Sequence, residues 1–205
     1  MEPFRKQIGI VVPFDRVNVD TDQIVPKQFL KLVERTGFGR YLFHDWRFNA
    51  DGTPKADFVL NKERFKEGKI LLTRANFGCG SSREHAVWAL ADFGFKTLIA
   101  PSYADIFYNN CFKNGVLPIT LGEAKVNDLF AEVERGEGYA LQIDLVKESI
   151  RKPNGTELLF KVDPFRRKCL LEGLDDISLT LLHEQSIRSY ERKLAPFQVI
   201  NASEV

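Results

Sequence analysis

Cysteine is scarce in this chain. Only three occur in 205 residues, at Cys79, Cys111 and Cys169. So sparse and odd a set does not suit a disulfide framework and fits a reducing compartment, so we expect a cytoplasmic protein. There is no C-x-x-C pair, and the histidines are scattered at His44, His85 and His183. This spacing argues against a metal site held by this chain alone.

Excess charge and long hydrophobic runs are also lacking. Lys and Arg number 29 against 28 Asp and Glu, which leaves a net charge of +1 and no large positive field for nucleic acid. The early apolar run from Ile8 to Val12 is too short for a secretory signal, and no run approaches the roughly 18 apolar residues of a membrane helix. We therefore expect neither a nucleic-acid partner nor a membrane association.

The apolar runs that are present predict an α/β fold. Short buried strands alternate with helices in the middle of the chain: strands at 69–73, 96–100 and 116–121, and helices at 82–93 and 102–113. Ser102 and Asp105 form a predicted capping box for the second of these helices. This order, with short connections, is typical of a parallel βαβαβ layer with right-handed crossovers. Hydrophobic residues make up 44% of the chain and no persuasive linker interrupts it, so residues 1–205 are predicted to form one domain.

The flanking segments are expected to add further elements. Before the layer we predict a strand at 8–12 ended by Pro13, a helix from Pro26 to about Val33, and a long loop at 36–57. After it we predict a helix at 123–135, antiparallel strands at 139–146 and 157–162, and a mainly helical C-terminal extension at 163–194.

The stretch NFGCGSSREHAVWAL at 76–90 carries the chemistry. Two glycines allow positive φ, and the N–H groups of residues 80–83 would cradle an anion at a helix N-terminus. The third glycine of a dinucleotide turn is missing and no Gly-Lys-Ser/Thr follows, so a nucleotide site is weakly supported. A carboxylate suits the residues better, because Arg83 offers a planar fork and Ser81 and Ser82 carry hydroxyls beside it.

The local pattern leaves a structural alternative open. Ser81 and Glu84 satisfy the S-x-x-E capping box, so Ser81 would only cap the helix and Arg83 would face solvent. Local pattern supports capping and catalysis about equally. His85 is interpreted as a packing or orienting residue, and Asp20 and Asp22 as turn-forming and capping residues.

Four ordered motifs carry a family resemblance: VDTDQIVPKQFL at 19–30, GFGRYLFHDWRF at 37–48, GSSREHA at 80–86 and IAPSYADIFYNNCFKNGVLPI at 99–119. Together they resemble the small subunits of the 3-isopropylmalate dehydratases, which are the mobile swivel domains of the aconitase superfamily. The resemblance runs from about residue 4 to residue 195. It implies an aconitase-like swivel fold, to which the residue pattern adds the antiparallel strands at 139–146 and 157–162.

The resemblance also implies an activity and a partner. The family isomerises 2-isopropylmalate and 3-isopropylmalate through a dehydrated intermediate in leucine biosynthesis, with a [4Fe-4S] cluster on the large subunit acting as Lewis acid. Carried over by motif, Ser81 is the base, Arg83 binds a substrate carboxylate and Ser82 donates a hydrogen bond. The chain is then expected to bind no cofactor itself and to be active only with the large subunit.

The segment at 27–39 matches the substrate-recognition loop of the family. The run that ends in Lys31 and Leu32 makes these two residues candidates for substrate binding, with Leu32 as a wall for the isopropyl group. An inward-packing Leu32 fits the pattern equally well. Three alternative functions stay open: a homoaconitase-like small subunit, a citraconate- or methylmalate-type hydratase small subunit, and a non-catalytic anion-binding regulatory subunit.

Overall fold

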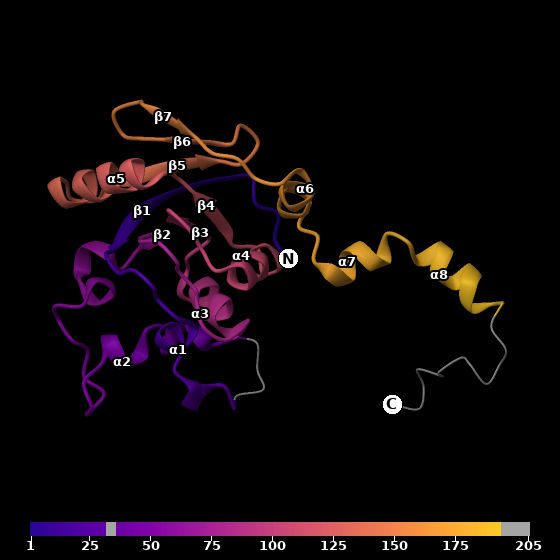
Figure 1. Ribbon diagram of the computed structural model, residues 1–205, viewed down its shortest axis with the longest axis horizontal. Coiled ribbons are helices and arrows are strands. Elements are labelled where there is room, and N and C mark those ends of the chain that lie inside the picture. The colour runs from indigo at the N-terminus through magenta and orange to yellow at the C-terminus, as the bar shows by residue number, and fades with distance from the viewer. Residues whose placement is uncertain (32–35, 194–205) are drawn as a thin grey trace.

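One seven-stranded sheet organises the chain, with strand order β4-β3-β2-β1-β5-β6-β7 (Figure 1). The computed structural model describes residues 1–31 and 36–193. Four neighbouring strands are parallel: β1 (Lys6–Phe14), β2 (Gly68–Thr73), β3 (Thr97–Ala100) and β4 (Leu117–Thr120). Three more extend the sheet antiparallel: β5 (Ala140–Asp144), β6 (Ser149–Arg151) and β7 (Glu157–Leu159). The predicted α/β fold, with a βαβαβ layer and additional antiparallel strands, is confirmed.

Helices join the parallel strands and cover both faces of the sheet. α3 (His85–Phe93) connects β2 to β3, and α4 (Asp105–Lys113) connects β3 to β4. α5 (Glu123–Arg135) returns to β5 and contacts β1, β2 and β3 from the side opposite α3 and α4 (Figure 1). In β2, Ile70, Leu71 and Leu72 are all fully buried, as expected of a strand covered on both faces.

Several short elements lie between β1 and β2. They are two single-turn helices, α1 (Thr21–Ile24) and α2 (His44–Arg47), and four 3₁₀ turns, η1 (Lys27–Phe29), η2 (Phe38–Tyr41), η3 (Val59–Asn61) and η4 (Glu63–Phe65). Part of the long loop predicted at 36–57 is therefore ordered as η2 and α2. The helix predicted from Pro26 is wrong for the described residues, where Pro26 precedes only the single turn η1.

The first strand also differs from its prediction. β1 continues through Pro13 to Phe14, whereas the sequence was expected to end it at Pro13. Pro13 pairs with Leu72 of β2, but the pairing of β1 with β5 stops at Ile10. The proline thus falls where β1 has a strand on one side only, and a strand tolerates a missing N–H there.

The C-terminal extension is helical as predicted. α6 (Pro164–Glu172) packs near α4, and α7 (Asp176–Leu181) and α8 (Glu184–Glu191) follow it away from the sheet (Figure 1). A pair of hairpins precedes it: β5, β6 and β7 form a meander, in which the three-residue strand β6 was not predicted. Among the described residues, no helix has the length and apolar character needed to cross a membrane.

Candidate active site

Three loops meet where the parallel strands β1, β2 and β3 end, and the loop after β2 runs between the other two. On one side, the N–H of Gly78 donates to the carbonyl of Val19 (2.7 Å). On the other, the N–H of Ala104 donates to the carbonyl of Phe77 (3.1 Å). Residues 77–79 are thus held as a short strand-like segment between both neighbours. This edge is where open α/β sheets bind their ligands.

Two glycines turn the chain sharply within this loop. Gly78 and Gly80 have φ of 77° and 83°, the left-handed region that glycine adopts without strain. A Cβ on Gly78 would lie 2.1 Å from Cγ of Phe107, inside the van der Waals contact distance. A Cβ on Gly80 would lie 3.3 Å from Cβ of Asp20. The glycines therefore allow the loop to pass close to α4 and to the segment after β1.

The two serines follow these turns at the surface. The side chains of Ser81 and Ser82 are exposed. The hydroxyl of Thr21 donates to the carbonyl oxygen of Ser81 (2.8 Å), which fixes the backbone at that position. A cavity of about 250 Å³ opens beside the serines, and its lining includes Thr21, Ser81, Ser82, Arg83, Ile106 and Phe107. The structure thus brings three of the predicted site residues to one cavity.

Arg83 is held by a carboxylate that the sequence analysis interpreted differently. Its guanidinium Nη1 donates to Oδ1 of Asp22, and the side chains are 19% and 49% exposed. The hydrogen bond from Arg83 lowers the pKa of Asp22 below its ordinary value. Asp22 lies in the first turn of α1, in keeping with its interpretation as a turn residue, and its carboxylate also holds Arg83 at the candidate site, which was not predicted. Because the two residues lie 61 positions apart, their spacing gave no signal of the pair.

The neighbouring Asp20 does act as a cap. Its carboxylate accepts from the N–H of Gln23 (2.7 Å), while the side chain of Gln23 accepts from the N–H of Asp20 (2.9 Å). This reciprocal pair is the capping box of α1. The prediction for Asp20 is confirmed, and α1 in turn carries Thr21 and Asp22 toward the serine loop.

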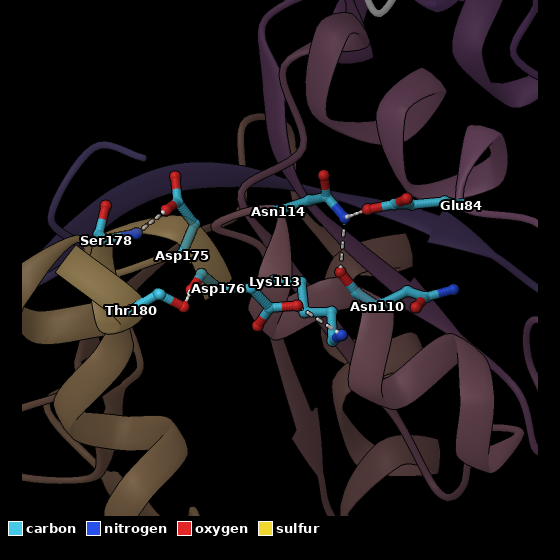
Figure 2. A network of polar contacts seen from close by, with 8 residues as sticks. All are labelled: Glu84, Asn110, Lys113, Asn114, Asp175, Asp176, Ser178 and Thr180. Atoms are coloured by element: carbon cyan, nitrogen blue, oxygen red, sulfur yellow. Dashed lines mark hydrogen bonds and ion pairs between the residues drawn. The ribbon is translucent and has the colours of Figure 1, made fainter. Parts of the chain in front are cut away.

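The predicted capping box at Ser81 is wrong. α3 begins at His85, three residues later than predicted, and its N-cap is Glu84. The carboxylate of Glu84 accepts instead from Nδ2 of Asn114 (2.8 Å), which lies at the end of α4 (Figure 2). Residues 80–83 precede the first turn of α3, so their N–H groups are loop donors and not the helix terminus that was expected. Ser81 is left at the cavity without a capping role.

The predicted capping box of α4 is also wrong. Ala104 is the N-cap of α4, and the hydroxyl of Ser102 accepts from the N–H of Asn76 (2.9 Å). Ser102 thereby attaches the loop after β3 to the loop after β2. The hydroxyl supports the packing of the two loops, and α4 still ends at Lys113 as predicted.

His85 and Cys79 flank the serines in the sequence, the first as a packing residue and the second as a thiol of raised pKa. The ring of His85 lies 5.2 Å from that of Phe38 and 4.6 Å from that of Trp88, as a packing residue would. Burial lowers the pKa of His85, which keeps the imidazole neutral. Burial raises the pKa of the Cys79 thiol, so it is not a ready thiolate.

Of the two residues predicted from the recognition loop, the structure describes only Lys31. Lys31 is exposed in the turn after η1, and it is absent from the lining of the cavity beside the serines. Two residues earlier, the ring of Phe29 stacks on Tyr41 at 4.1 Å. Leu32 lies outside the described residues.

Comparison with known proteins defines the class of this fold and site. A family model described as "Aconitase C-terminal domain" matches residues 1–124, which include all three loops. A second, described as "LeuD_N", matches residues 127–164. The chain therefore carries an aconitase C-terminal domain.

Relatives identify the particular family. A 3-isopropylmalate dehydratase small subunit from Brevibacillus brevis is 57% identical over 193 residues, covering 94% of this chain and 100% of that protein. One from Methylibium petroleiphilum is 58% identical over 200 residues, covering 93% of each. The crystal structure of a 3-isopropylmalate dehydratase from Methanocaldococcus jannaschii superposes with a TM-score of 0.64 at 28% identity, over 91% of this chain and 99% of that one. This chain belongs to the family of 3-isopropylmalate dehydratase small subunits.

Proposed function

We propose that this small subunit supplies the base and an anion clamp to a hydro-lyase site shared with the large subunit. Ser81 removes the proton from the substrate carbon during dehydration, Arg83 binds a substrate carboxylate, and Ser82 donates a hydrogen bond. The observation that carries the proposal is that these three residues share one cavity at the ligand-binding edge of the sheet. Chemistry in leucine biosynthesis follows from the family.

A serine hydroxyl is a poor base and needs a favourable environment to act as an alkoxide. The guanidinium of Arg83, two positions away on the same cavity wall, supplies positive potential. Asp22 occupies one of its nitrogens, and the five-donor fork of arginine leaves others for a carboxylate. When Ser81 accepts the carbon-bound proton it becomes a neutral hydroxyl, and it returns a proton to carbon in the rehydration step.

The iron–sulfur cluster that the family implies does not fit the cysteines of this chain. Cys111 is fully buried and Cys169 nearly so, and burial raises the pKa of both thiols. Among the described residues there is no group of three or more His, Cys, Asp or Glu side chains that could hold a metal ion. We therefore assign the cluster to the large subunit and propose no role in the reaction for the thiols of this chain.

Several finer assignments belong to the same proposal. Lys31 and Leu32 are retained as substrate-binding residues on the family resemblance, with Leu32 as the wall for the isopropyl group. The assembly is proposed to be cytoplasmic, to bind isopropylmalate, and to bind neither nucleic acid nor membrane. Residues 1–205 are proposed to form one domain.

The test is Ser81→Ala, assayed with the large subunit for hydration of the dehydrated intermediate. Loss of the base is expected to lower kcat by about 10²- to 10⁴-fold, while binding to the large subunit and the thermal midpoint stay unchanged. Thr53→Ala, which removes a hydroxyl that does not line the cavity, is the control. Nearly native turnover by Ser81→Ala would remove Ser81 as the base.

The same hydration assay identifies which substrate the complex prefers. Wild-type complex is given isopropylmaleate, homoaconitate and citraconate in parallel, and isopropylmaleate is expected to be hydrated fastest. Faster turnover of either competitor would favour a homoaconitase-like or citraconate-type enzyme. No turnover of any of them by a fully assembled complex would favour the regulatory alternative.

A further inference from the structure

Two short helices at the C-terminal end present an uncovered apolar surface. We call α7 and α8 together the C-terminal arm, which extends away from the sheet (Figure 1). Neither helix has a buried residue. The large apolar side chains exposed on the arm and on the turn between its helices are Ile177, Leu181, Leu182, Ile187 and Tyr190.

This surface is costly in water. The helices have six and eight residues, and isolated helices shorter than about 12 to 15 residues are marginal without packing. Ile177 and Leu181 lie four residues apart on one face of α7, and Ile187 and Tyr190 lie three apart on one face of α8. Clustered apolar faces of this kind mark interaction sites. The arm therefore calls for a covering partner.

The base of the arm is attached to the helix that borders the serine loop. Nζ of Lys113, the last residue of α4, donates to Oδ2 of Asp176 (2.7 Å) (Figure 2). One residue further along α4's end, Asn114 binds Glu84 of the GSSRE motif. The side chain of Asp175 caps α7 by accepting from the N–H of Ser178 (2.8 Å). α4 thus connects the arm and the proposed active site through a polar network.

A cavity joins the two regions on the surface. It measures about 630 Å³ and lies between α4, α6 and α7, with Phe165, Leu179 and Ile106 in its wall. Ile106 also lines the cavity beside Ser81, and its side chain is 53% exposed. Phe165 is likewise exposed at 59%. An apolar path therefore runs from the serine cavity, across Ile106 and Phe165, to the arm.

We propose that the large subunit docks along this path and covers the C-terminal arm. The inference rests on the proposed function, in which the large subunit must close over the exposed Ser81 and Ser82 and so meets Ile106 at the rim of the same cavity. Continuity of the apolar path then carries the interface to Phe165 and the arm. The partner surface is expected to offer aliphatic and aromatic side chains with a polar rim.

The test measures the Kd between full-length small subunit and cluster-loaded large subunit. Ile187→Glu/Tyr190→Glu places two charges on the apolar face of α8, and Kd is expected to rise about 30-fold or more. Gln185→Glu/Ser189→Glu adds the same two charges on the opposite face of the same helix and is expected to change Kd less than about threefold. Phe165→Ser probes the cavity and is also expected to weaken binding. Circular dichroism melts establish that each variant folds.

Three results would overturn the proposal. One is a native Kd for both the α8 apolar variant and Phe165→Ser. Another is equal weakening by the two charge pairs, which would indicate net charge and not the apolar face. The third concerns the isolated small subunit. If it sediments as a dimer, and Ile187→Glu/Tyr190→Glu makes it monomeric without changing its affinity for the large subunit, the arm binds a second copy of this chain.

The proposed function fails in a different way. If Ser81→Ala turns over normally while the α8 apolar variant does not bind the large subunit, the assignment of Ser81 is wrong and the docking surface stands. If Ser81→Ala is inactive with native Kd, and the α8 apolar variant and Phe165→Ser both bind normally, the base stands and the docking surface is wrong.

Discussion

Arg83 meets two demands at once. It is proposed to bind a substrate carboxylate, yet its Nη1 already donates to Asp22. A guanidinium has five donors in a fixed plane, so a carboxylate on one edge orients the remaining edge for a second acceptor. At 19% side-chain exposure, Arg83 is partly withdrawn from water and keeps this orientation. We interpret Asp22 as the residue that positions the clamp.

Asp22→Asn is expected to raise KM for isopropylmalate about three- to tenfold with a smaller change in kcat, because the charge-assisted bond that orients Arg83 is lost at a half-exposed position. Steady-state kinetics of the complex measure both constants. Asp20→Asn is the matched control, since asparagine caps a helix as well as aspartate and Asp20 has no bond to Arg83. A lower KM for Asp22→Asn would mean that Asp22 competes with substrate.

At the scale of the elements, the loop after β2 depends on one close approach. Gly78→Ala would force a Cβ into the buried ring of Phe107 and place alanine at φ 77°. The free energy of unfolding is expected to fall by about 2 to 4 kcal/mol, as measured by urea denaturation of the isolated chain. Turnover of the complex should fall as well, because the serines follow this turn.

Gly52→Ala separates the clash with Phe107 from the backbone strain of alanine at positive φ. Gly52 has φ 83°, but a Cβ there meets no atom within 4 Å. Its expected cost is only the conformational one, about 1 to 2 kcal/mol. Equal losses for the two variants would contradict a role for the Phe107 contact.

The elements that sequence pattern predicted well are those specified locally. The continuous apolar run of β2 and the amphipathic pattern of α5 need no distant partner, and Gly94 ends α3 in the left-handed conformation that glycine adopts without strain. The start of α3 could not be predicted in this way, because Glu84 is bound by Asn114, 30 residues further on. β6 has only three residues and is ordered by strands on both sides.

The residues of the candidate site also fall into two groups, those that a local motif predicts and those that only the fold brings together. Ser81, Ser82 and Arg83 are contiguous, so one motif was enough to predict that they lie together. Asp22 and Ile106 reach the same region through the topology of the sheet, and no spacing in the sequence indicates them. Asp22 does fall within the VDTDQ run of the family motif, which is the one signal that could have indicated it.

For the whole molecule, the free energy of unfolding at low pH is expected to depend on Asp175, the residue that caps the first helix of the arm. The N–H of Ser178 and its side chain lower the pKa of Asp175 to about 2. The pKa of an unfolded aspartate is about 3.9. Between this pKa and that of folded Asp175, the unfolded chain binds more protons than the folded chain, which destabilises the fold. The contribution of Asp175 is therefore complete above about pH 4 and is lost as the pH falls through about 2.

Asp175→Asn is expected to keep the cap of α7 but remove this titration. Urea denaturation at about pH 5 and about pH 2.5 should then show a smaller loss of unfolding free energy in the variant than in the wild type. Asp51→Asn, in a turn far from the arm, also removes a carboxylate of lowered pKa and tests whether the effect is specific to the arm. Hydrogen exchange of the α7 backbone amides is measured in both variants. If Asp175→Asn and Asp51→Asn changed this exchange equally, a role for Asp175 in attaching α7 would be contradicted.

The hydrogen bonds that hold residues 77–79 between two neighbouring loops have a kinetic consequence. Ser81 follows a backbone tied to the segments after β1 and β3, so it shifts only when that whole edge of the sheet shifts. In the proposed complex, the loop that carries the serines therefore does not act as a hinged flap of its own. We therefore expect access to Ser81 to depend on how the two subunits separate and close, and the lifetime of their closed arrangement to set how long a dehydrated intermediate is retained.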